Sequence, residues 1–107
     1  MTTPGSLLYV VKQIEGLGRK AIGVVADVTS LKEVESMIQK SVDTLGPLNV
    51  MIANAGIAQV KKALDLTEED VRRMFDVNFF GVFNCYSSAA KQFIKQETPG
   101  KILGAAR

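Results

Sequence analysis

Lysines, tyrosines and carboxylates are the side chains left for acid–base chemistry in this 107-residue sequence, because it has no His and a single Cys. The absence of His excludes Ser-His and Cys-His catalysis and most transition-metal sites within the chain. No metal site is therefore predicted. A lone Cys85 cannot form an internal disulfide, which favours a reducing compartment.

Two groups of candidate ligand-binding residues share a position directly after a short apolar run. They are Asp27 and Val28 after residues 21–26, and Asn54, Ala55 and Gly56 after residues 48–53. The first run is rich in β-branched residues, and both runs are typical of a buried strand. Ligands of open α/β sheets bind at the carboxyl ends of the strands, so these residues are placed to line a site. Each feature also has a simpler interpretation. Taken alone, Asp27 is typical of an acidic residue in a turn, and Asn-Ala-Gly is typical of a turn sequence.

The elements that would position these residues alternate along the chain. Apolar residues at three- and four-residue spacing predict helices over residues 6–17, 31–45 and 67–96, and a third short apolar run predicts a strand over residues 101–106. Ser30 and Glu33 have the capping-box pattern, and Thr67 with its following acids is a second cap. Helix and strand in alternation predict an α/β fold with a short parallel sheet of about three strands and helices on its faces.

The helix over residues 67–96 is apolar on more than one side. Its apolar arc is about 200° wide, whereas a helix on one sheet needs roughly 100°. Self-association is the leading explanation, with a homodimer formed through Phe79, Phe83, Ala90 and Ile94, and cover by neighbouring helices is the alternative. Gly81 in mid-helix costs about 1 kcal/mol relative to Ala unless close packing uses its missing side chain.

Taken in order, Ala26-Asp27-Val28-Thr29, Asn54-Ala55-Gly56, Val77-Asn78 and Gly100-Lys101-Ile102-Leu103 resemble the middle of a short-chain dehydrogenase/reductase, most of all its fungal members. The set covers essentially the whole chain. It departs from the family pattern at Ala53, where many members have a further Asn. The resemblance implies one partial, three-layer Rossmann-like NAD(P)-binding domain over residues 1–107.

The resemblance also implies roles for the candidate residues. Asp27 would cap the adenine ring through its carboxylate and Val28 would supply a backbone contact. Asn54, Ala55 and Gly56 would line the cofactor ribose. Asn78 matches the Asn of the catalytic tetrad, but without the rest of the tetrad we expect it to be vestigial, a buried Asn that satisfies backbone groups at a helix irregularity.

Several parts of the family pattern are missing from these 107 residues. There is no Gly-rich phosphate-binding turn, and Arg107 stands near the place of the catalytic Ser. Neither Tyr9 nor Tyr86 has a Lys four residues later. We expect weak or absent binding of NAD or NADP and no oxidoreductase activity. The strand over residues 21–26 should pair directly with that over 48–53, or borrow strands from another chain.

Two other functions remain open. One is a non-enzymatic interaction protein that acts as a dimer on a protein receptor, as fungal immunomodulatory proteins do. The other is a regulatory subunit of a full-length dehydrogenase. The net charge of +2 comes from scattered, interleaved charges, so neither nucleic acid nor a membrane surface is expected as a partner. No signal peptide or membrane-spanning run is present, which favours the cytoplasm.

Overall fold

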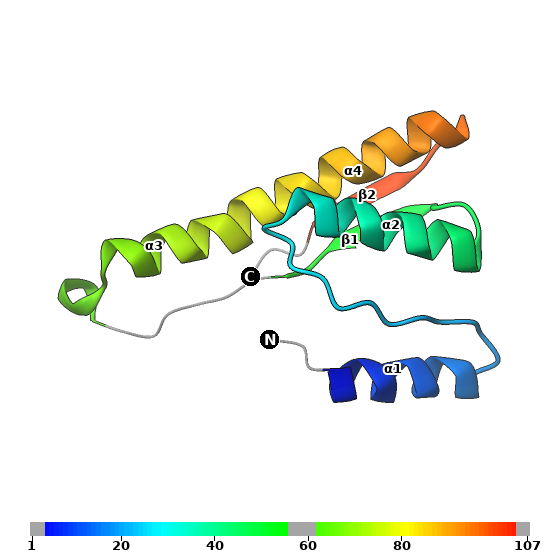
Figure 1. The fold of residues 1–107 in the computed structure, drawn as a ribbon, viewed down its shortest axis with the longest axis horizontal. Helices are drawn as coiled ribbons and strands as arrows, with labels where there is room; N and C mark the ends of the chain where they lie inside the picture. Colours follow the sequence, from blue (N-terminus) through cyan, green and yellow to red (C-terminus); the bar gives the residue numbers. More distant parts are fainter. Residues whose placement is uncertain (1–3, 56–61, 105–107) are drawn as a thin grey trace.

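The computed structural model describes residues 4–55 and 62–104. Its helices and strands follow the predicted order, except that no strand forms between the first two helices (Figure 1). In chain order they are α1 (Pro4–Gly16), α2 (Leu31–Leu45), β1 (Val50–Ala53), a 3-10 turn (Ala63–Asp65), α3 (Glu68–Phe75), a π-helical segment (Asp76–Phe80), α4 (Gly81–Gln96) and β2 (Lys101–Gly104). The α/β class is confirmed.

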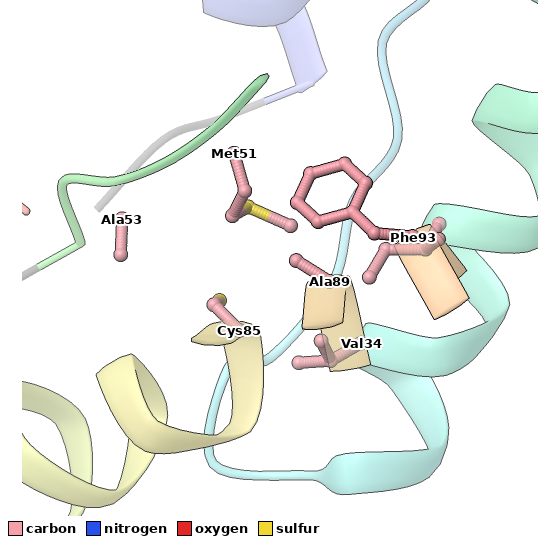
Figure 2. Close-up of a cluster of buried hydrophobic side chains, with 7 residues drawn as sticks. Val34, Met51, Ala53, Cys85, Ala89 and Phe93 are labelled. Carbon is pink, nitrogen blue, oxygen red and sulfur yellow. The ribbon is translucent and has the colours of Figure 1, made fainter. Parts of the chain in front are cut away.

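β1 and β2 form a parallel pair with Met51 opposite Ile102. Along β1 buried and exposed residues alternate, so Met51 and Ala53 face the helices while Val50 and Ile52 face away. Helices α2 and α4 cover the buried face (Figure 1). The core between them, shown in Figure 2, comprises Val34, Ile38, Met51, Ala53, Cys85, Ala89 and Phe93.

The predicted strand over residues 21–26 is not formed. This segment runs extended, without strand hydrogen bonds, and Gly23 and Val25 are exposed rather than buried. A strand requires a hydrogen-bonded neighbour, and within residues 4–55 and 62–104 β1 pairs only with β2. The segment instead lies along α1, where a Cβ added to Gly23 would stand 3.3 Å from Leu7 Cβ and 3.5 Å from Val11 Cγ2. The expected direct pairing with the strand of residues 48–53 is therefore absent from the described part of the chain.

Local capping signals set most of the helix ends. Gly18 and Gly46 take positive φ angles of 83° and 101° after α1 and α2. Thr67 and Asp70 form a complete capping box at the start of α3. At α2 only half of the predicted box forms, because the Ser30 side chain accepts from the Glu33 N–H while the Glu33 carboxylate accepts from the Asp27 N–H.

The predicted long helix exists, but five residues in its middle are π-helical. The segment Asp76–Phe80 links α3 to α4 without a break in direction (Figure 1). The apolar side of this helix does not pack along its whole length: Val71 and Phe75 are exposed because α3 extends past the sheet and no other described helix or strand covers it. The packed stripe begins at α4 with half-buried Val82 and continues through Cys85, Ala89 and Phe93.

The chain is extended for its length. Its radius of gyration is 15.6 Å, whereas a compact domain of this size has about 13 Å. Helix α1 touches no other described helix or strand. Within the described residues no helix is both long and apolar enough to cross a bilayer.

Candidate functional site

The first candidate residues lie in a tight turn over residues 27–30, where the extended segment leads into α2. The Ser30 N–H donates to the Asp27 carbonyl at 3.0 Å and closes the turn. Within it, the Thr29 hydroxyl and the Thr29 N–H both donate to the Asp27 carboxylate, at 2.7 and 3.0 Å. Asp27 is thus held in a fixed orientation although its side chain is exposed.

The two hydrogen bonds from Thr29 lower the pKa of the Asp27 carboxyl, with the hydroxyl contributing more than the backbone N–H. Because one carboxylate oxygen takes both bonds, the second is available to a ligand. At neutral pH the turn therefore presents an ionised acceptor to solvent.

The N–H of Val28 is the matching donor. All peptide bonds described are trans, so the Val28 N–H points opposite to the Asp27 carbonyl, which is turned inward toward Ser30. It finds no acceptor among the described residues. An outward donor beside an outward carboxylate matches the acceptor and amino group on the edge of an adenine ring, so the residues present fit that end of a dinucleotide.

Helix α4 packs against this turn and fixes its position. A Cβ at Gly81 would stand 2.6 Å from Val28 Cγ2, so the glycine lets the Val28 side chain seat directly on the helix backbone. One turn later, Asn84 Nδ2 donates to the Val28 carbonyl at 2.9 Å. The sequence prediction missed Asn84, since its partner lies 56 residues away and no local pattern marks it.

The second candidate group lies at the carboxyl end of β1. Asn54 and Ala55 are both exposed there, whereas Gly56 falls outside the described residues. Asn54 and Ala55 line a small hollow of about 100 Å³ together with Gly81 and Cys85. Gly81 thus contacts Val28 and also borders the Asn54 hollow. The two candidate groups therefore both lie next to Gly81.

Asn78 lies within the π-helical segment, so the predicted helix irregularity is present. Its predicted burial is wrong, because Asn78 is exposed. Asn78 lies on the part of the helix that precedes the buried residues of α4. Its neighbours Phe79 and Phe80 are exposed as well.

Neither a metal site nor a cysteine nucleophile is evident in the described part of the chain. It holds no cluster of three or more residues able to bind a metal ion. Cys85 is buried in the core, and burial raises the pKa of its thiol, which keeps it protonated and unreactive.

Comparison with known proteins shows the family. The profile described as short chain dehydrogenase matches residues 2–105. A short-chain dehydrogenase/reductase of Armillaria gallica is 45% identical over 100 residues, which are 94% of this chain and 38% of the relative. The chain belongs to the short-chain dehydrogenase/reductase family.

Solved structures agree with this assignment. A short-chain type dehydrogenase/reductase from Mycobacterium marinum superposes with a TM-score of 0.91 at 33% identity, over 97% of this chain and 42% of that one. An alcohol dehydrogenase from Thermococcus sibiricus, solved with 5-hydroxy-NADP, shares the fold with a TM-score of 0.80 at 24% identity, over 94% of this chain and 42% of that one. The chain spans only about 38% of the length of the curated relative.

Proposed function

We propose that these 107 residues form the adenine and ribose side of an NAD(P)-binding domain and do not by themselves catalyse hydride transfer. The observation that carries the proposal is the position of Gly81, which contacts Val28 and also borders the Asn54 hollow. This brings the Asp27 turn and the end of β1 to the same region of the molecule. Asp27 and Val28 offer an acceptor and a donor to the adenine, and Asn54 and Ala55 offer a surface to the ribose.

Binding through this half-site should be weak. The Asp27 side chain is exposed, and the hollow beside Asn54 encloses only about 100 Å³. Enclosed cofactor sites occupy about 300 Å³ or more. The 107 residues contain no Gly-rich turn for the pyrophosphate, so the adenine contacts act alone. We expect dissociation constants of about a millimolar or weaker for NAD and NADP alike.

Carbonyl reduction also needs a proton donor beside the substrate, with a pKa brought near neutrality. When bound, NAD(P)H would supply the hydride. The Tyr9 hydroxyl lies on α1, where it accepts from Gln13 Nε2 at 3.1 Å, away from both candidate groups. The Tyr86 hydroxyl lies close to the backbone of Gly104 on β2. Neither tyrosine has a lysine four residues later, at the family spacing.

The activity part of the proposal is tested by assaying the purified 107-residue chain. NADH and NADPH oxidation is followed with small ketones and diketones as substrates, against heat-denatured protein. We expect no turnover above that control, and turnover with either cofactor would overturn the proposal.

A second proposal concerns self-association. Phe79, Phe83 and Ile94 are 59%, 61% and 77% exposed, and Ala90 is half-buried beside them. The Phe79 ring contacts Phe75 in a tilted and Phe80 in an edge-on arrangement, with ring centroids 5.9 and 5.3 Å apart, so these three exposed rings form one cluster. Apolar surface gathered in this way is typical of a protein interface. We infer that a second copy of this chain covers it, forming a homodimer through residues 67–96.

A further inference from the structure

The peptide group between Val28 and Thr29 is held at both of its ends. Its carbonyl accepts from Asn84 Nδ2 at 2.9 Å, and its N–H donates to the Asp27 carboxylate at 3.0 Å. This is the central peptide of the turn closed by Ser30, and the central peptide is the part of a four-residue turn that can flip between alternative turn types. Its orientation therefore decides whether Thr29 can orient the Asp27 carboxylate.

We propose that Asn84 is a positioning residue for the adenine end of the cofactor site. Its side-chain amide fixes the Val28–Thr29 peptide, which in turn orients the Asp27 carboxylate beside the outward Val28 N–H. A flipped peptide would turn its carbonyl away from α4 and its N–H away from Asp27, so both contacts would be lost together. This role rests on the proposed cofactor site. The test therefore measures the effect of Asn84 on the turn and its effect on ligand affinity separately.

Asn84 is well placed to fix the Val28–Thr29 peptide. Asn84 is half-buried, as is Val28, so their hydrogen bond is partly shielded from competing water. Gly81, three residues earlier on the same helix, receives the Val28 side chain. The side chain and the carbonyl of Val28 are thus both fixed to α4, whereas Asp27 and Thr29 are exposed. A donor is required at position 84, because the Val28 carbonyl can only accept.

The test uses two variants of the 107-residue chain. Asn84→Ala removes the amide. Asn84→Asp keeps its shape but has no donor at neutral pH, and it serves if the first variant does not fold. Gln39→Glu is the matched control: Gln39 Nε2 donates to Asp43 on the exposed surface of α2, so the control makes the same amide-to-carboxylate change away from the turn.

Two spectroscopic readouts concern the turn alone. In Asn84→Ala, hydrogen exchange of the Thr29 amide should be about tenfold faster, as expected for the loss of one partly buried hydrogen bond. The pKa of Asp27, followed by its carboxyl carbon resonance, should rise toward its usual value. If Asn84 contributed only to the stability of the fold, its removal would leave the pKa of Asp27 unchanged. A folded variant with the wild-type Thr29 exchange rate and the wild-type Asp27 pKa would overturn the inference.

A third readout concerns the ligand. ADP-ribose, used as the probe, should bind either Asn84 variant about five- to tenfold more weakly than wild type, while Gln39→Glu binds it equally well. Equal affinity in all variants would overturn the role of Asn84 in the site. Failure of the wild-type chain to bind ADP-ribose would overturn the proposed function instead, and the two turn readouts would then decide whether Asn84 fixes the peptide.

Discussion

Gly81 and Val28 are in such close contact that a Cβ added to the glycine would stand 2.6 Å from Val28 Cγ2 and 3.2 Å from Val28 Cβ. This accounts for a glycine in the interior of a long helix, where it is otherwise unfavourable by about 1 kcal/mol. The contact seats the Asp27 turn on α4, so one residue serves both the packing of the helix and the position of the candidate site.

Gly81→Ala should therefore lower stability although Ala is the better helix former. The new methyl group has no room beside Val28, and overpacking of this kind costs about 1–3 kcal/mol. Chemical denaturation followed by circular dichroism measures the change. The control is Gly16→Ala at the end of α1, where an added Cβ meets no atom within 4 Å. A Gly81→Ala protein more stable than wild type would contradict the close contact.

Gln96 connects the end of α4 to Leu48, two residues before β1. Its Oε1 accepts from the Leu48 N–H at 2.7 Å and its Nε2 donates to the Leu48 carbonyl at 2.9 Å. Gln96→Ala leaves both partly buried backbone groups without this partner, so the free energy of unfolding should fall by about 1–3 kcal/mol. Gln39→Ala, which removes an exposed amide from α2, should change it by less than about 0.5 kcal/mol. Equal effects of the two substitutions would show that the Leu48 contact contributes little.

Thr29→Val tests the electrostatics of the turn. It removes the hydroxyl that donates to Asp27 at 2.7 Å, the larger cause of the lowered pKa, so the pKa of Asp27 should rise toward its usual value. In wild type a lowered folded-state pKa stabilises the fold above the unfolded-state pKa, and this stabilisation is lost as pH falls through the folded-state value. The variant should thus be less stable than wild type at neutral pH, with the difference shrinking in acid. Carboxyl-carbon titration and denaturation at both pH values measure this, and an unchanged Asp27 pKa would contradict it.

The double substitution Phe79→Ser with Phe83→Ser tests the proposed dimer. Both rings are more than half exposed, so their loss should disturb the fold little while removing the apolar surface of the interface. Light scattering at micromolar concentration should give a dimer for wild type and a monomer for the variant. Tyr9→Ser with Val10→Ser, at two exposed positions on α1, is the control and should remain dimeric. A monomeric wild-type chain would contradict the interface.

Local signals in the sequence predicted much of this fold. The periodicity and the caps predicted α2 with its observed bounds, Leu31–Leu45, and the short apolar runs predicted the positions of β1 and β2. The extended segment over residues 21–26 was predicted wrongly because a strand is defined by its neighbour, and composition does not report whether a neighbour is present. The exposure of Asn78 was missed for a related reason: it depends on where the π-helical segment leaves the sheet.

The candidate site was predictable only in part. Asp27, Val28, Asn54 and Ala55 could be named because they follow apolar runs and match a family pattern. Asn84 could not, since its contact with Val28 joins residues 56 positions apart on unlike elements. The internal bonds from Thr29 to Asp27 were likewise not predicted, although Asp with Thr two residues later is a common turn arrangement.

The central claim, that the chain carries one half of a cofactor site, is tested most directly by titrating the isotope-labelled chain with ADP-ribose and, separately, with nicotinamide mononucleotide. With ADP-ribose up to about 10 mM, the amide resonances of Val28 and Asn54 should shift along a saturable curve with a millimolar midpoint. Nicotinamide mononucleotide should leave them unmoved. Absence of any shift with ADP-ribose, or equal shifts with both compounds, would contradict the account.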